Sequence, residues 1–232
     1  MNAVVVSLRG MSKAVLVYER LRTEITALTR EPGSRIDKNE VCDQFGVLRQ
    51  PVAEALARLS EDGLVDVHPQ SGSFVALIRI ADVEEAAFVR QAIEAEMARE
   101  IALGTDGELI SELNRILEYQ AFAARIVDVA EFYQLDLRFH AALFARLGKP
   151  RPADVVERMR PHLERARRML LPNLRRNEQT LQEHRDVVEA LATRVPEAAA
   201  SAMRTHLTNS MEAFRRFADE HASLFEPGVR PS

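Results

Sequence analysis

One stretch decides the fold of the first part of the chain: Gln44-Phe45-Gly46-Val47-Leu48-Arg49-Gln50-Pro51-Val52-Ala53-Glu54-Ala55-Leu56-Ala57-Arg58-Leu59-Ser60-Glu61-Asp62-Gly63-Leu64. Its apolar residues recur at the spacing of one helical face. Gly46 permits the positive φ of a sharp turn. Pro51 is tolerated because the first turn of a helix needs no backbone donor there. A tight turn followed by a short amphipathic helix predicts the recognition helix of a helix-turn-helix.

The flanking residues extend this pattern. A helix is predicted near 14–30, ended by Glu31-Pro32-Gly33, and Asp37 is placed to cap a second helix that stops at Gly46. After Gly63 two strands are predicted, over 64–67 and 73–77, with a tight turn between them. We therefore expect a leader over residues 1–12 and a winged helix-turn-helix domain over residues 13–78.

The rest of the chain carries helical patterns alone. Helices are predicted near 82–103, 106–126, 128–147, 152–170, 174–193 and 196–221. They form an all-helical domain over residues 82–221, followed by a tail over 222–232. The predicted fold class is mostly α, with an N-terminal winged helix-turn-helix and a C-terminal all-α bundle.

Composition limits the class of protein. Apolar residues make up 47% of the 232 residues, which is enough for folded cores, and no apolar run is long enough to cross a bilayer. No signal segment opens the chain and Cys42 is its single cysteine, so a cytoplasmic location is expected. Residues 1–78 hold nine Lys and Arg against ten Asp and Glu. DNA binding therefore requires a local basic face, doubled by dimerisation.

The helical half holds a candidate metal site. Asp136 and His140 are four residues apart and share one helix face, while His184 and His206 lie on the apolar stripes of two later helices. Burying these four groups without partners would cost several kcal/mol, and a divalent metal would satisfy them together. The set suits zinc most closely, with nickel, manganese or iron as alternatives. The competing interpretation is that the histidines are hydrogen-bonded core residues and that Asp136 bonds His140 within the helix.

Two further polar residues are candidates for binding a small molecule. Arg90 falls on a predicted buried stripe, where its planar guanidinium suits a carboxylate. The alternative is a salt bridge to an internal Asp or Glu. Asn209 follows His206 by three residues and either lines the same cavity or is a solvated helix residue.

These residues resemble a known family. The run from Gly46 to Leu56, with Leu59, Gly63-Leu64 and the wing Gly72-Ser73-Phe74-Val75, is similar to the GntR family of bacterial transcription regulators. The helical half resembles the FCD-type ligand-binding domain of the FadR subfamily. That second likeness is carried by Phe88-Val89-Arg90, Ile93-Glu94, Asp136-Leu137-Arg138-Phe139-His140, Glu183-His184-Arg185 and His206. Together the two likenesses extend over about residues 13–220.

The resemblance implies a homodimeric transcription regulator, not an enzyme, that binds a palindromic operator in double-stranded DNA. It also implies that Asp136, His140, His184 and His206 hold the metal. A small organic acid would bind beside it, at Arg90 and Asn209, and would change DNA binding by a coupling energy of about 1–3 kcal/mol. The residues expected to contact DNA are Lys38, Asn39, Arg49, Gln50, Arg58, Ser71 and Gly72.

The recognition helix departs from the family pattern. Leu48, Gln50 and Ala53 stand where Ser or Thr, Thr and Arg are usual. Leu48 cannot cap the helix, and Arg49 is the one remaining arginine of the usual DNA-facing set. Gln50 is suited to reading adenine instead. Two alternatives stay open: a metal-dependent enzyme, since a metal site with open positions can activate water, and a dimerisation module that no longer binds DNA.

Overall fold

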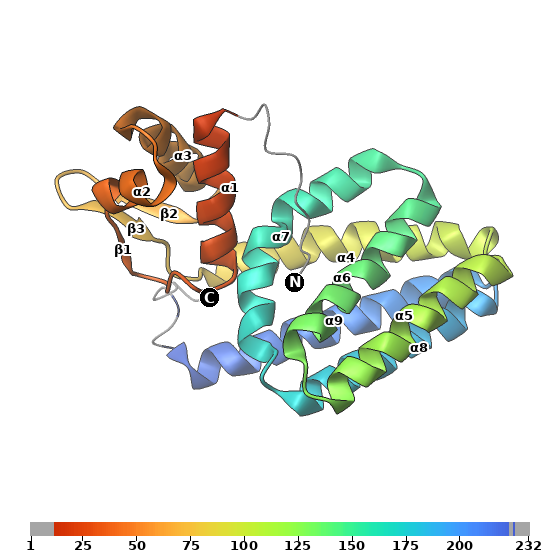
Figure 1. The fold of residues 1–232 in the computed structure, drawn as a ribbon. Helices are drawn as coiled ribbons and strands as arrows, with labels where there is room; N and C mark the ends of the chain where they lie inside the picture. The colour runs from red at the N-terminus through yellow and green to blue at the C-terminus, as the bar shows by residue number, and fades with distance from the viewer. Residues whose placement is uncertain (1–11, 223–224, 226–232) are drawn as a thin grey trace. The chain divides into compact units, whose positions relative to one another are not determined.

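The computed structural model describes residues 12–222 and residue 225. The chain divides into two compact units, residues 1–78 and residues 79–232, each described here by itself (Figure 1). The predicted leader and tail lie outside the described residues, apart from Ser12, Ala222 and Phe225. Among the helices of residues 12–222, none combines the length and apolar character needed to cross a membrane.

The first unit contains the predicted helix-turn-helix. Helix α1 spans Lys13–Thr26, α2 spans Lys38–Phe45 and α3 spans Arg49–Glu61. Asp37 caps α2 as predicted, because its side chain accepts hydrogen bonds from two backbone N–H groups of the first turn. Gly46 ends α2 with φ of 61°, the left-handed conformation that the turn into α3 requires. One apolar face of each helix packs into a common core.

The wing contains one strand more than predicted. Strands β2 (Val65–His68) and β3 (Gly72–Val75) form the expected hairpin, and β1 (Arg35–Ile36) pairs antiparallel with the other edge of β3. The sheet order is β1-β3-β2. The prediction of a two-stranded wing is therefore wrong, because a two-residue strand is too short to show an alternating pattern.

Helix α1 ends earlier than predicted. It stops at Thr26 instead of near Arg30, and Leu28 adopts a left-handed backbone with φ of 60°. A leucine rarely adopts this conformation, so the residue type gives no sign of the helix end there.

The second unit is all-helical over its described residues, as predicted. Its helices are α4 (Ile80–Leu103), α5 (Gly107–Arg125), α6 (Val129–Leu147), α7 (Pro150–Leu170), α8 (Leu174–Ala192) and α9 (Pro196–Glu220). Asp106, Asp128 and Asn173 cap α5, α6 and α8 through their side chains. The predicted fold class, mostly α with a small wing, is confirmed.

Packing within this unit brings residues of all six helices to one polar centre. Helix α4 packs along α9 and α7, and α8 packs between α5 and α9. Helix α7 bends along its length in Figure 1, and Pro161 lies inside it. A proline there removes one backbone hydrogen bond and accounts for the bend. The bend directs the second half of α7 alongside α4, where its arginines reach the centre.

Candidate functional site

The start of helix α3 presents the predicted DNA-reading residues. The guanidinium Nη2 of Arg49 donates a 2.8 Å hydrogen bond to Oδ1 of Asn39 on α2, and both side chains are exposed. Two of the seven predicted DNA contacts thus lie together. The bond orients the Arg49 side chain at the exposed start of α3.

The other predicted residues are more scattered. Nε2 of Gln50 donates to Oε1 of Glu54 at 3.0 Å, and Lys38 is exposed at the start of α2. Arg58 follows Arg49 by nine residues, about two and a half helical turns, so the two side chains leave opposite sides of α3. The Arg58 guanidinium packs 3.9 Å from the ring centroid of Tyr18 on α1. Arg58 therefore supports the α1–α3 packing.

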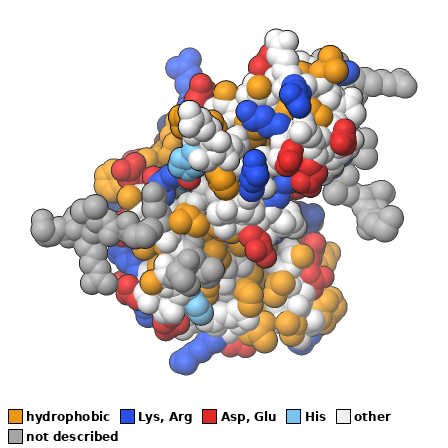
Figure 2. Space-filling view, turned by 90° about the vertical axis from the view of Figure 1, so that its left-hand side faces the viewer, with side chains coloured by type: hydrophobic (Ala, Val, Ile, Leu, Met, Phe, Trp, Pro, Cys, Tyr) orange, Lys and Arg blue, Asp and Glu red, His pale blue; other side chains and the backbone are white. Residues whose placement is uncertain are grey.

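The wing contains an arginine that the sequence analysis missed. Ser71 is exposed and Gly72 has φ of 114°, and the Arg35 side chain passes beside Gly72. A Cβ atom at position 72 would lie 3.5 Å from Nε of Arg35. Arg35 thus adds a positive charge at the wing turn. Figure 2 nevertheless shows Lys and Arg side chains close to Asp and Glu on the face it presents, in line with the near-zero charge of residues 1–78.

Leu48 occupies the N-cap of α3 without capping it. Its backbone is extended, it makes no side-chain bond to the helix, and its side chain is 78% exposed. We expect Leu48→Ser to stabilise the first unit by about 0.5–1 kcal/mol, since a hydroxyl can accept the Gln50 N–H. Pro51 lacks an N–H, which keeps the gain at the lower end of the usual range.

Urea unfolding and hydrogen exchange in the first turn of α3 measure this effect. Leu48→Ala is the matched control, because it removes the exposed leucine without adding an acceptor. Equal stability of the Ser and Ala variants would contradict the capping argument.

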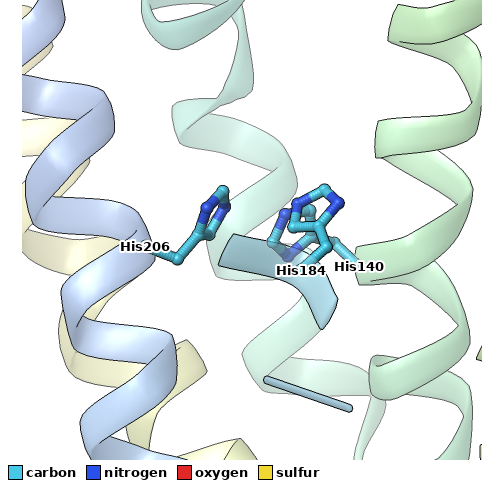
Figure 3. A group of neighbouring side chains, drawn as sticks. All are labelled: His140, His184 and His206. Atoms are coloured by element: carbon cyan, nitrogen blue, oxygen red, sulfur yellow. The ribbon is translucent and has the colours of Figure 1, made fainter. Parts of the chain in front are cut away.

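Three histidines meet inside the second unit. His140 on α6, His184 on α8 and His206 on α9 are buried, and one ring nitrogen from each lies within 4.8 Å of the others. Figure 3 shows the three rings converging from separate helices. The His184 ring stacks on Phe139, with 4.1 Å between centroids and 12° between planes. The predicted histidines are therefore brought together on a rigid apolar support.

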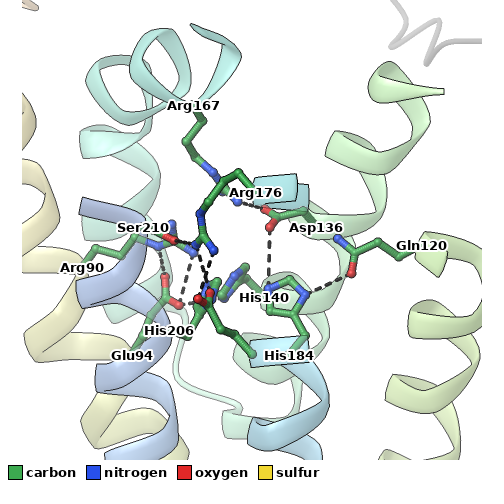
Figure 4. Close-up of polar contacts among 11 residues, drawn as sticks. Arg90, Glu94, Gln120, Asp136, His140, Arg167, Arg176, His184, His206 and Ser210 are labelled. Carbon is green, nitrogen blue, oxygen red and sulfur yellow. Dashed lines mark hydrogen bonds and ion pairs between the residues drawn. The ribbon is translucent and has the colours of Figure 1, made fainter. Parts of the chain in front are cut away.

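Each histidine is oriented through Nδ1 by an oxygen. Oε1 of Gln120 lies 3.0 Å from Nδ1 of His184, Oε2 of Glu183 lies 2.9 Å from Nδ1 of His206, and Oε2 of Glu94 lies 2.7 Å from Nδ1 of His140 (Figure 4). For His184 and His206 the contact is a hydrogen bond, which places the ring proton at Nδ1 and leaves the Nε2 lone pair free, the arrangement usual for metal-ligating histidines. The contact of Glu94 with His140 is an ion pair without hydrogen-bond geometry.

Among the described residues none makes a hydrogen bond to Nε2 of His140, His184 or His206. Burial lowers the pKa of His184 and of His206 well below the usual value, so both rings are neutral at pH 7. Neutral imidazole is the form that binds a metal.

Asp136 stands at the edge of this cluster. It is almost fully buried, and its Oδ1 lies 3.6 Å from Nε2 of His184. Its Oδ2 forms an ion pair with the guanidinium of Arg167 from α7. Burial opposes ionisation of this carboxyl, but Arg167 outweighs it and holds the pKa of Asp136 well below its usual range. The intrahelical hydrogen bond to His140 considered from the sequence is not formed.

Arg90 forms a salt bridge to an internal acid, which was the alternative to binding a carboxylate ligand. Its Nε donates a 2.6 Å hydrogen bond to Oε1 of Glu94, one turn further along α4, and both side chains are buried. Glu94 thus joins Arg90 to His140. The Arg90–Glu94 spacing of four residues was visible in the sequence and could have identified this pair.

Asn209 contacts the centre through Glu183. Its Nδ2 donates to Oε1 of Glu183 at 3.0 Å, and Arg176 donates to both oxygens of the same carboxylate at 3.0 and 2.9 Å. Asn209 is not among the residues that line the cavities beside the histidines. The roles of four residues in the site were missed: Gln120, Arg167, Arg176 and Glu183. Gln120 and Arg167 meet partners on other helices, and such contacts leave no periodic signal in a single sequence. Arg176 and Glu183 lie seven residues apart on one face of α8, a spacing that could have identified the pair.

Two cavities adjoin the cluster. One, of about 560 Å³, is bordered by Glu94 and His140. The other is narrower, mostly apolar, and reaches Asp136. Arg90, Tyr133 and Arg167 line both. A small molecule in either cavity would meet positive charge beside the histidines.

Comparison with known families now identifies the chain. Residues 13–75 match the family described as "Bacterial regulatory proteins, gntR family", and residues 85–209 match the FCD domain. The chain belongs to the GntR family. Because its relatives are transcription regulators and not enzymes, this GntR-family protein is a DNA-binding transcription regulator, and the enzyme alternative is set aside.

Individual relatives agree with this assignment. The HTH-type transcriptional repressor RspR of Escherichia coli K12 is 32% identical over 209 residues, 90% of this GntR-family chain and 92% of RspR. Among solved structures, a putative GntR regulator from Rhodococcus sp. RHA1 has a TM-score of 0.74 at 23% identity, and E. coli McbR/YncC has 0.72 at 17%. Each alignment covers 89% of this chain and 99% of the other. These two structures support the fold alone.

Proposed function

We propose that this regulator binds a palindromic operator as a homodimer, and that a small carboxylate metabolite bound beside a divalent metal ion controls its DNA binding. The observation that carries the proposal is the set of three converging histidines, whose buried Nε2 atoms make no hydrogen bond to any described residue. Unpartnered buried polar groups cost free energy, so a site that retains three of them is built for a ligand.

The residues present fit a metal ion. His140, His184 and His206 would supply neutral nitrogens, and Asp136 a carboxylate oxygen. This donor set suits zinc first, and also nickel, manganese or iron. When bound, the ion would supply positive charge and open positions for an oxygen ligand. Glu94, Gln120 and Glu183 would keep the rings in place through Nδ1.

The carboxylate would enter the cavities lined by Arg90. The guanidinium of Arg90 adds positive charge beside the histidines, although Glu94 already neutralises part of it. Asn209 would act by holding Glu183, and through it His206. Metabolite binding would then shift the population between two dimer geometries, as coupling between two distinct sites requires.

The near-zero net charge of the first unit is the reason for proposing a homodimer. One unit with a net charge near zero presents few phosphate contacts, and pairing two units on a palindrome doubles them. Arg49, supported by Asn39, would then supply the principal base or phosphate contact in each half-site.

A gel shift on the DNA upstream of the protein's own gene tests the proposal. The wild type is expected to bind at low salt, and Arg49→Ala is expected to weaken binding by about 1–3 kcal/mol, roughly 5- to 150-fold. Arg204→Ala, which removes an exposed arginine of the second unit, is the charge-matched control. For the zinc-loaded protein, one member of a panel of small organic acids is expected to change the binding.

Two results would contradict the proposal separately. No binding by the wild type at low salt would favour the dimerisation module that no longer binds DNA. Binding that no organic acid in the panel alters would instead remove the proposed control by a carboxylate.

A further inference from the structure

Arg167 occupies the position where a metal ion and a carboxylate ligand would meet. Its guanidinium leaves α7 and pairs with Oδ2 of Asp136, the one carboxylate in the proposed ligand set. The same side chain lines both cavities beside the histidines. In Figure 4 Arg167 reaches down from its helix to Asp136, next to His184.

The paired charges around the histidines balance without a metal. Three acids, Glu94, Asp136 and Glu183, are each paired with one arginine, namely Arg90, Arg167 and Arg176. A divalent ion at Asp136 would add two positive charges within a few ångströms of the Arg167 guanidinium. Repulsion between like charges is strong where water is excluded, so Arg167 opposes the ion unless an anion joins it.

Tyr133 places a buried hydroxyl beside Arg167. The side chain is 2% exposed, and among the described residues no group makes a hydrogen bond to its Oη. It lines both cavities, and the Arg167 guanidinium lies 5.7 Å from its ring centroid. Burial raises the pKa of Tyr133 to about 12, so its hydroxyl keeps its proton and can donate it. A buried hydroxyl without a partner calls for an acceptor in the cavity.

We propose that Arg167 couples the two ligands of this regulator. It neutralises Asp136 while no metal is held, and it turns to the carboxylate of the metabolite when a metal takes Asp136, with the Tyr133 hydroxyl as second donor. The inference rests on the proposed function and deepens it. Since linkage is reciprocal, the acid tightens metal binding by the same factor as the metal tightens binding of the acid.

The test measures zinc affinity alone, by competition with a chromophoric chelator at about pH 8, where every carboxylate is ionised. Arg167→Gln is expected to bind zinc more tightly than the wild type, by roughly 5- to 150-fold, the range typical of coupled sites. Glutamine keeps an amide donor for Asp136, so the carboxylate is not left bare. Arg158→Gln is the matched control, because Arg158 lies on the same helix, is exposed and lines neither cavity.

The second arm uses thermal shift with the same panel of organic acids. An acid that stabilises the zinc-loaded wild type is expected to stabilise the Arg158→Gln variant equally, and to lose most of its effect in Arg167→Gln and Tyr133→Phe. Unchanged or weaker zinc binding by Arg167→Gln would overturn the inference, since Arg167 would then support Asp136. Equal stabilisation of the Arg167→Gln variant by the acid would also overturn it. A wild type that binds no zinc, or no acid, would instead refute the proposed function itself.

Discussion

Replacing His184 by alanine is expected to abolish tight zinc binding and the zinc-dependent rise in melting temperature. His184 is completely buried, it stacks on Phe139, and its Nε2 lies close to both His140 and Asp136. The remaining two histidines and the carboxylate could not close a tetrahedral site. The loss should be complete at zinc concentrations that saturate the wild type.

The expected size of the stabilisation by zinc follows from mass action. A ligand that binds the folded state alone stabilises it by about 4.1 kcal/mol at a thousand times its Kd. The wild type should show a melting temperature that rises with the logarithm of zinc concentration, and the variant a flat line. Each protein is compared with its own metal-free form, because His184→Ala also removes packing against Phe139 and the partner of Gln120.

Elemental analysis of the purified proteins gives an independent reading. His221→Ala is the matched control, because His221 is exposed at the end of α9 and lies outside the cluster. It should retain the wild-type metal content. Equal zinc content in the wild type and in His184→Ala would show that the cluster is a hydrogen-bonded core and not a metal centre.

The histidine cluster could be predicted because its signal is local. Asp136 and His140 share a face through their spacing of four residues, and His184 and His206 each lie on an apolar stripe of their own helix. Helix periodicity shows which side chains point inward. It does not show which inward side chains meet, so Gln120, 64 residues from His184, could not be assigned to it.

The arginines of α7 also show that helix periodicity does not reveal which side chains meet. Helix α7 is rich in arginine and none of its arginines was predicted to join the site, yet Arg167 reaches the buried Asp136. The bend at Pro161 and the packing of α7 on α4 decide this, and both are properties of the tertiary fold. In the first unit, by contrast, Gly46 and Asp37 determine the helix-turn-helix locally, and both were predicted correctly.

Replacing Glu94 by alanine is expected to destabilise the second unit by about 3–5 kcal/mol, the usual cost of leaving one member of a buried ion pair alone. Glu94 is 1% exposed and lies between Arg90, at 2.6 Å, and Nδ1 of His140, at 2.7 Å. Its removal leaves the buried Arg90 guanidinium unpaired and takes the orienting acceptor from His140. Urea unfolding at pH 7 measures the loss.

The stability that the Arg90–Glu94 pair contributes is expected to fall at acid pH. Burial opposes ionisation of Glu94, but Arg90 and then His140 outweigh it and lower its pKa far below the usual value. A lowered pKa contributes stability that is fully present above the unfolded-state value of about 4.3, and that is lost as the pH falls below it. The wild type should therefore lose this stability in acid, while Glu94→Ala, which lacks the carboxyl, should show a smaller decline.

A double variant separates the ion pair from mere packing. Arg90→Met combined with Glu94→Leu replaces both charges by apolar groups, and it should recover much of the stability lost in Glu94→Ala, because no buried charge is left unpaired. It should nevertheless bind zinc less tightly than the wild type, since His140 has lost the carboxylate that orients it.

A Glu94→Ala variant as stable as the wild type would show that Arg90 finds another partner. Wild-type zinc affinity in the double variant would show that His140 is oriented by its helix alone.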